Sequence, residues 1–174
     1  MTDANVAHLE QLLRGTQKTE KRERLAAEQT LKSMQSQPKF AVVTLHLVSS
    51  NAIDMTCRQA GSILFKNFVK KCWDGRTINV TEKNIVKQHI LDLMCTAPRA
   101  IMVQISESLR IIADSDFPQH WKELLPGIIE KLKSTTHDLR VLNGVLETAN
   151  AIFKRFRYVE KSDTLFIDLS YILT

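Results

Sequence analysis

The side chains that most often perform catalysis or hold metals are scattered along this chain of 174 residues. The histidines fall in different segments without the spacing of metal ligands, and they are His8, His46, His89, His120 and His137. The motifs of zinc proteases, serine hydrolases and phosphate-binding loops do not occur. We therefore predict no catalytic residue, no metal and no cofactor, and we expect no enzymatic activity. His46 and His89 lie in or beside apolar patterns, and we interpret them as hydrogen-bonded packing residues.

The pattern of the cysteines also indicates buried packing residues rather than catalytic or metal-binding ones. Cys57, Cys72 and Cys95 are odd in number, form no C-x-x-C pair and sit in apolar helical patterns, which is typical of buried free thiols in a reducing compartment. The N-terminus lacks the basic region and apolar run of a secretory signal. The longest apolar stretch, residues 40–48, is too short to cross a bilayer. We expect a protein of the cytosol or nucleus that does not insert into membranes.

Composition favours a soluble helical protein. Hydrophobic residues make up 44% and charged residues 25% of the chain, as in folded globular proteins. Glycine (5) and proline (4) are scarce, whereas a sheet protein needs more turn residues. The net charge of +5 favours an acidic partner. Nucleic-acid binding is not favoured, because no run of five or more lysines and arginines occurs.

Apolar residues recur at three- and four-residue steps, which predicts nine helical segments. Odd-numbered segments begin near residues 3, 38, 81, 118 and 162, and even-numbered ones near 18, 52, 98 and 137. The odd-numbered starts are thus roughly 35 to 44 residues apart, and the even-numbered starts have similar gaps, which is typical of HEAT or armadillo units. We predict an all-α, right-handed solenoid of HEAT repeats. Its helix pairs would occupy residues 1–36, 38–73, 81–114 and 118–158. An irregular bundle of the same helices is the alternative.

Single residues refine this prediction. Asn51 can cap the fourth helix. Pro118 should start the seventh, whose inward-facing residues would be Trp121, Leu124, Leu125, Ile128, Ile129 and Leu132. Pro126, inside that seventh pattern, should bend the helix. Gly144 would let the eighth helix approach a partner helix closely.

The last segment, residues 162–174, reads as the first helix of a fifth pair. Its apolar residues are Leu165, Phe166, Leu169, Ile172 and Leu173, and no partner helix follows them. A solenoid end normally carries a polar cap. We therefore expect a truncated product, or an end that something else covers.

The polar faces of the even-numbered helices are the candidate binding residues. On the fourth helix the row is Gln59, Ser62, Lys66 and Lys70, and on the eighth it is Asn143, Glu147, Asn150, Lys154 and Arg157. If these helices line the concave side, the rows form a ladder of donors and cations for an extended, partly acidic protein. Ordinary solvated surface is the alternative. RNA binding would need exposed aromatic platforms, and we expect Phe153 and Phe156 to be buried.

Three stretches carry resemblances to known families. Residues 58–73, from Arg58-Gln59-Ala60 to Lys70-Lys71-Cys72-Trp73, resemble the importin-β N-terminal domain. The segments 116–121 and 143–157, with Phe-Pro-Gln-His-Trp and Phe-Lys-Arg-Phe-Arg, resemble the exportin-2 family. The resemblance implies HEAT repeats whose inner helices bind Ran in its GTP form, and export of importin-α from the nucleus. Trp73 and Trp121 are expected to pack between repeats.

Lys66, Asn67 and Lys70 match the family motif directly. The full set of expected Ran contacts is Gln59, Lys66, Asn67, Lys70, Asn143, Lys154 and Arg157. The resemblance also implies nuclear pore proteins as partners and shuttling between nucleus and cytoplasm, with the nuclear envelope as a further location. Family members continue for many more repeats, so a truncated form is expected. The alternative is a stand-alone solenoid adaptor that binds protein or RNA without Ran.

Overall fold

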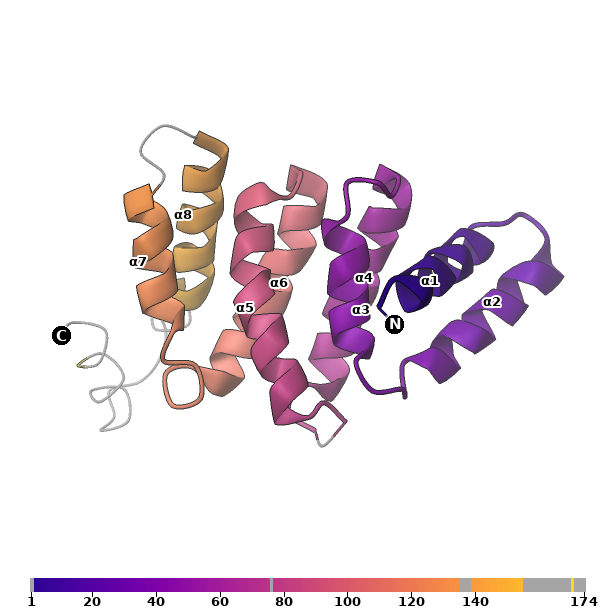
Figure 1. Ribbon diagram of the computed structural model, residues 1–174, viewed down its shortest axis with the longest axis horizontal. Coiled ribbons are helices and arrows are strands. Elements are labelled where there is room, and N and C mark those ends of the chain that lie inside the picture. Colours follow the sequence, from indigo (N-terminus) through magenta and orange to yellow (C-terminus); the bar gives the residue numbers. More distant parts are fainter. Residues whose placement is uncertain (1, 76, 135–138, 155–169, 171–174) are drawn as a thin grey trace.

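A computed structural model describes residues 2–75, 77–134, 139–154 and 170 (Figure 1). The helices are α1 (Thr2–Thr16), α2 (Lys21–Met34), α3 (Phe40–Ser49), α4 (Met55–Cys72), α5 (Val80–Thr96), α6 (Arg99–Asp116), α7 (Leu124–Ser134) and α8 (Leu139–Phe153). These described ranges contain no β-strand. Apart from Ser170, the helix predicted at residues 162–174 lies outside the described residues.

The helices form a stack of pairs in two layers. Each helix packs against the next in its pair: α1 on α2, α3 on α4, α5 on α6 and α7 on α8. Neighbouring pairs are joined within each layer, because α3 packs on α5, α4 on α6, and α6 on α8. In Figure 1 the helices α3, α5 and α7 stand in front and α4, α6 and α8 behind. The predicted all-α solenoid is confirmed.

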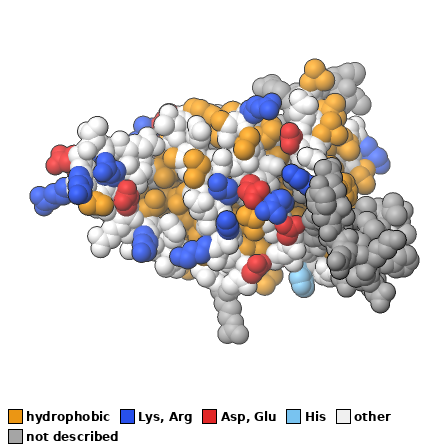
Figure 2. Space-filling view, turned by 180° about the vertical axis from the view of Figure 1, so that it is seen from behind, with side chains coloured by type: hydrophobic (Ala, Val, Ile, Leu, Met, Phe, Trp, Pro, Cys, Tyr) orange, Lys and Arg blue, Asp and Glu red, His pale blue; other side chains and the backbone are white. Residues whose placement is uncertain are grey.

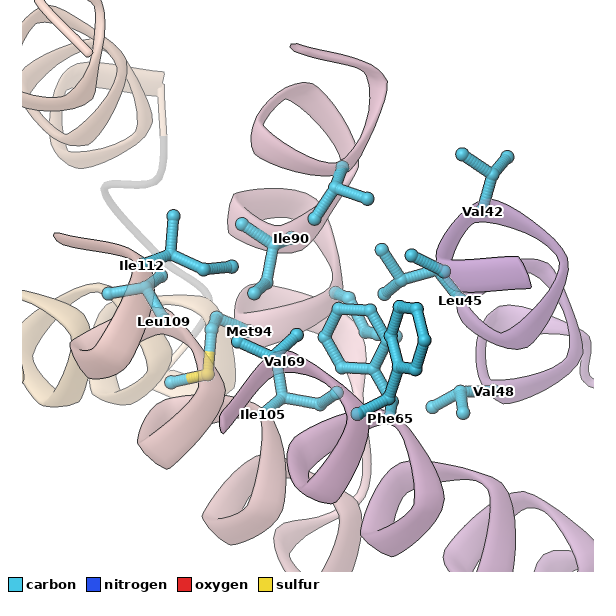
Figure 3. Packing of buried hydrophobic residues seen from close by; sticks show 14 of the residues in the cluster. Val42, Leu45, Val48, Phe65, Val69, Ile90, Met94, Ile105, Leu109 and Ile112 are labelled. Carbon is cyan, nitrogen blue, oxygen red and sulfur yellow. The ribbon is translucent and has the colours of Figure 1, made fainter. Parts of the chain in front are cut away.

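A continuous apolar core lies between the two layers. Figure 3 shows buried side chains from four helices meeting there, including Leu45, Phe65, Ile90 and Ile105. In α5 and α6 the buried apolar residues recur at one-, three- and four-residue steps, and they are Val86, Ile90, Leu93, Met94, Ile105, Leu109 and Ile112, with Met102 partly buried. Because each pair leaves one apolar side for its neighbour to cover, stacking of the pairs is what removes this surface from water.

The start of α4 differs from the prediction. Asp54, not Asn51, is the cap: its side chain accepts a hydrogen bond from the Cys57 N–H at 2.9 Å. Asn51 lies three residues earlier in the turn, where its side chain accepts a hydrogen bond from Arg58 at 3.0 Å. Both residue types can cap a helix, and the length of the turn decides which one reaches the free N–H groups.

A buried carboxylate joins the second and third pairs. Glu82, in the first turn of α5, is only 4% exposed. Its oxygens accept hydrogen bonds from the backbone N–H groups of Lys39 (3.0 Å) and Ala41 (3.1 Å) at the start of α3. These N–H groups have no partner inside their own helix. A side chain from the next repeat therefore supplies the cap that the sequence around α3 lacks.

The predicted start of the seventh helix was wrong. Residues 117–123 form an irregular turn, and α7 begins only at Leu124. Trp121 is buried as expected, at 3% exposure, but it lies in this turn. Pro126 consequently stands in the first turn of α7, where its missing N–H removes no helical hydrogen bond. The predicted bend at Pro126 was therefore also wrong.

Only part of the inward-facing set predicted for α7 is buried. Leu124 and Ile128 are buried, whereas Ile129 and Leu132, predicted to point inward, are 49% and 37% exposed. At about 100° per residue, Ile129 lies roughly 140° from Leu124 around the helix. The apolar run of α7 is thus wider than the side that α8 and the rest of the stack cover.

Gly144 permits the close approach that the sequence predicted. A Cβ atom built at this position would lie 2.3 Å from the Met94 carbonyl oxygen and 2.9 Å from the Cys95 Cα atom. No larger residue fits there without displacing backbone. The glycine therefore seats α8 directly against the C-terminal part of α5.

Candidate protein-binding face

The exposed sides of α4, α6 and α8 together form what we call the even-helix face. On α4, Gln59, Asn67 and Lys70 are exposed and Lys66 is half-buried, so all four predicted contact residues of this helix reach the surface. Ser62, predicted in the same row, is fully buried, and its hydroxyl donates a hydrogen bond to the Gln59 carbonyl at 2.7 Å. The helical period places it between the exposed row and the core.

The arginine of the family-like stretch has a structural task. Arg58 is 8% exposed. Its Nε donates to the Val48 carbonyl at 2.8 Å and its Nη1 to the Asn51 side chain at 3.0 Å. Carbonyls at the end of a helix lack partners inside it, and a cation there also complements the helix dipole. Arg58 therefore fixes the end of α3 onto α4 and positions the exposed row behind it.

The central helix of this face, α6, was not among the predicted binding helices with named residues. On α6, Arg110 is held between two carboxylates: its Nη2 lies 2.8 Å from Glu107 Oε1, and its Nη1 lies 2.7 Å from Asp114 Oδ2. The hydrogen bond from Arg110 lowers the pKa of Glu107, and the positive charges of Lys66 and Lys70 lower it further. Glu107 thus lies within electrostatic reach of the lysines on α4.

The even-helix face is consequently not a ladder of cations. Figure 2, which looks at the molecule from behind the view of Figure 1, shows acidic and basic side chains mixed on this side. The predicted row on α4 continues into the carboxylates of α6. The signal was present in the sequence, because Glu107, Arg110 and Asp114 follow each other at three and four residues. Such spacing places them on one side of a helix.

On α8 the exposed row is partly apolar. Asn143, Glu147 and Asn150 on α8 are exposed, and so is Lys154, the residue that follows its end. Arg157 and Phe156 lie outside the described residues. Phe153, predicted to be buried, is 39% exposed, and Leu146 is 53% exposed. The helix carries more apolar residues than its contacts with α5, α6 and α7 can cover.

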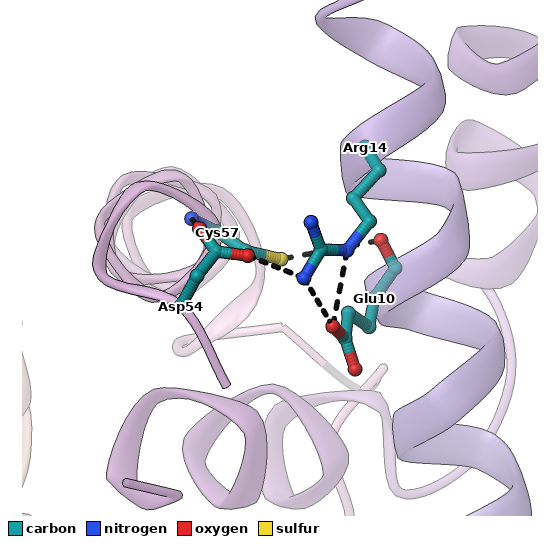
Figure 4. A network of polar contacts seen from close by, with 4 residues as sticks. All are labelled: Glu10, Arg14, Asp54 and Cys57. Atoms are coloured by element: carbon teal, nitrogen blue, oxygen red, sulfur yellow. Dashed lines mark hydrogen bonds and ion pairs between the residues drawn. The ribbon is translucent and has the colours of Figure 1, made fainter. Parts of the chain in front are cut away.

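Two polar clusters hold the helices that carry this face. Figure 4 shows Arg14 of α1 reaching Glu10 at 2.7 Å and, through an ion pair, Asp54 at the start of α4. Cys57 lies beside them, and burial is the main cause that raises the pKa of its thiol to about 11. It is therefore protonated at neutral pH, as expected for a packing cysteine.

The second cluster lies between α5 and the end of α6. The Lys87 ammonium and the Asp116 carboxylate form a buried ion pair at 2.7 Å, and Lys87 also donates to the His120 carbonyl at 2.7 Å. Burial alone would raise the pKa of Asp116, but hydrogen bonds from Lys87 and Ser115 outweigh it and hold that pKa below its ordinary value. Asp116 is thus ionised at neutral pH and anchors the turn that precedes α7.

Histidines from two helices meet on the opposite layer. The rings of His46 on α3 and His89 on α5 have centroids 5.8 Å apart, and His89 Nδ1 lies 2.8 Å from the Ile85 carbonyl. Both histidines are exposed, so they are not buried packing residues. The predicted hydrogen bond is present at His89. Among the residues that the structure describes, no three His, Cys, Asp or Glu side chains gather as metal ligands. Within the same residues, no helix combines the length and apolar character needed to cross a bilayer.

Comparison with known proteins agrees with the fold. The protein-family model for the importin-beta N-terminal domain matches residues 27–96 of this chain. Exportin-2 of Drosophila melanogaster is 36% identical over 99% of this chain and 18% of its own length. The importin-alpha re-exporter of Schizosaccharomyces pombe is 38% identical over 85% of this chain and 16% of its own length. The chain thus spans less than a fifth of the relatives it matches.

Solved structures give the same result. The exportin Cse1 in its cargo-free, cytoplasmic state superposes on 97% of this chain and 18% of its own, with a TM-score of 0.88 and 30% identity. A structure of Kap95p with RanGDP shares the fold, with a TM-score of 0.68 and 18% identity. Residues 27–96 are thus similar to an importin-beta N-terminal domain. Nearly the whole chain is similar to a part of exportin-2 and of the exportin Cse1.

Proposed function

We propose that this chain is the N-terminal, Ran-GTP-binding part of an exportin-2-like nuclear transport receptor that exports importin-α. The observation that carries the proposal is the similarity to exportin-2 along 99% of the chain, combined with an exposed polar row on α4. Gln59, Lys66, Asn67 and Lys70 are the proposed contacts on α4. Asn143 and Lys154 are those on α8, and Arg157 is a further candidate outside the described residues.

The role that follows is binding rather than chemistry. A transport receptor works by offering surfaces whose partners change between compartments, so we expect no enzymatic activity, and shuttling between nucleus and cytoplasm. Nuclear pore proteins, and residence at the nuclear envelope, belong to the same proposal. Because the chain spans 18% of the length of Drosophila exportin-2, the role proposed for this part is Ran binding rather than the full grip on cargo.

The test is binding of the purified chain to Ran loaded with GTP or GDP, measured by calorimetry. We expect clear preference for the GTP form. Lys66→Glu and Lys70→Glu should each weaken binding about threefold to tenfold at low salt, because each reverses a charge near the interface. Lys133→Glu on α7 is the matched control, because it makes the same change on an exposed residue outside the even-helix face. Equal binding to both nucleotide forms would contradict the proposal.

One observation supports the second candidate, a Ran-independent adaptor for RNA or protein. Phe153 is 39% exposed and adjoins the exposed Lys154, and an aromatic ring beside a cation can stack a base. Binding of single-stranded RNA that falls steeply with salt and is lost in Phe153→Ala would favour this candidate. The described part of the chain exposes no other large aromatic side chain, so Ran-dependent transport remains the proposed function.

A further inference from the structure

A groove of about 810 Å³ runs between α6 and α8 on the even-helix face. Met102 and Val103 line it from α6, and Leu146 lines it from α8. Val103 and Leu146 are 57% and 53% exposed. Two large aliphatic side chains left in water on the two walls of one groove mark a surface that a partner can cover.

The groove follows from the backbone packing of α8. Gly144 brings this helix so close to α5 that a Cβ atom would lie 2.3 Å from the Met94 carbonyl oxygen. Helix α8 is seated on α5 and also packs on α6, and the groove lies along the exposed side of this second contact, where Asn143, the neighbour of Gly144, lines it. Both walls are helices, so the groove is part of the fixed architecture.

Two asparagines indicate the conformation of the occupant. Asn143 and Asn150 both line the groove and are exposed. They are seven residues apart, or about 10.5 Å along a helix, which is near the length of three residues in an extended chain at about 3.3 Å each. A primary amide offers a donor and an acceptor, as a peptide group does. A helical partner has already bonded its backbone groups internally, so an extended segment is the better match.

The charges on the two walls are opposite. Arg99 lines the groove from the start of α6 and Glu147 lines it from α8. This arrangement complements a segment with a carboxylate toward α6 and a cation toward α8, and with little net charge. We infer that the groove binds an extended segment of a partner protein, with one aliphatic or aromatic side chain between Val103 and Leu146. The inference rests on the proposed function only in taking this face as a protein-binding surface, and it does not require Ran.

The experiment uses a phage-displayed library of random twelve-residue peptides. Peptides are selected on the full wild-type chain and depleted on Leu146→Asp, and the enriched ones are synthesised with a fluorescent label. Anisotropy titrations should show that Val103→Asp and Leu146→Asp each weaken binding about tenfold or more, as expected for a buried apolar anchor. Asn143→Ala combined with Asn150→Ala should weaken it about fivefold through lost hydrogen bonds to the peptide backbone. The affinity should change little with salt.

Three controls make the result decisive. Circular dichroism and thermal unfolding show that each variant is folded, which is expected because both apolar targets are exposed. Val80→Asp makes the same apolar-to-acid change at a residue that is 73% exposed and does not line the groove, and it should leave binding unchanged. Lys66→Glu should also leave peptide binding unchanged while weakening Ran, so that failure of one proposal is distinguishable from failure of the other.

The inference is overturned if no peptide is enriched, or if enriched peptides bind Leu146→Asp as tightly as the wild type. It is also overturned if the bound peptide is helical by circular dichroism. Methylation of the peptide nitrogens, which removes backbone donors, must weaken binding if the asparagines act as inferred.

Discussion

At the scale of single residues, the buried pair of Lys87 and Asp116 is the most consequential contact. The two groups lie 2.7 Å apart and are 7% and 8% exposed at their side chains. Removing one partner leaves the other charge buried and unpaired, which costs more than the pair itself contributes. The pair joins α5 to the end of α6, so its loss should destabilise the whole stack of helices.

We expect Asp116→Asn to lower the free energy of unfolding by about 3 kcal/mol at pH 7, measured by urea denaturation. Asp114→Asn, two residues earlier and exposed, is the control and should cost less than about 1 kcal/mol. The folded-state pKa of Asp116 lies below its ordinary value, so the contribution is present above the unfolded pKa of about 3.9. It is lost as the pH falls through the folded pKa. A difference between wild type and Asp116→Asn that persists at lower pH would contradict this account.

At the scale of helices, the approach of α8 to α5 depends on Gly144. Gly144→Ala would gain up to about 1 kcal/mol of helix propensity, but its Cβ would meet the Met94 carbonyl oxygen at 2.3 Å. Displacing packed backbone costs more than this gain, so we expect a net loss of about 1–2 kcal/mol in thermal unfolding.

Gly127→Ala is the matched control for this change. Its Cβ would meet only the Leu91 Cδ1 atom, at 3.1 Å, and the end of a flexible side chain can move. We expect this variant to be neutral or slightly stabilised, since alanine favours the helix. Equal losses in both variants would show that α8 is not held by the contact at Gly144.

Most helices were predictable from the sequence, because the apolar period and the glycine and proline boundaries agree. The start of α7 was not, since Pro118 is a common helix-start residue and the burial predicted for Trp121 does not show whether that residue lies in a helix or in a turn. The exposure of Phe153 was missed for a related reason. Periodicity shows which residues share a side of a helix, but it does not show how much of that side the neighbours cover.

At the scale of the whole molecule, the even-helix face combines charges from separate repeats. Residue types on α4 predicted a positive surface, whereas the structure places Glu107 of α6 where the charges of Lys66 and Lys70 lower its pKa. This proximity could not be predicted from α4 alone, because it depends on the stacking of α4 on α6. The match of Lys66, Asn67 and Lys70 to a family motif predicted contacts on this face, but it did not predict that the face carries charges of both signs.

Removing the carboxylate should therefore strengthen attraction to an acidic partner. Under the proposed function, we expect Glu107→Gln to raise the association rate with Ran-GTP about twofold to fivefold at low salt, and less at 0.15 M salt where screening is stronger. Stopped-flow fluorescence measures this rate. A slower association in Glu107→Gln would mean that this carboxylate contacts the partner directly.

The carboxylate of Glu82 has a consequence for how the stack can flex. Its oxygens accept hydrogen bonds from the backbone N–H groups of Lys39 and Ala41, and these bonds hold the beginning of α3 against the beginning of α5. Any bending between these two repeats must therefore pivot near their N-terminal ends and open most at the far ends of the two helices. Glu82 therefore acts as a fixed pivot. The curvature of the helical stack can change while the distance between the two repeats at Glu82 stays the same.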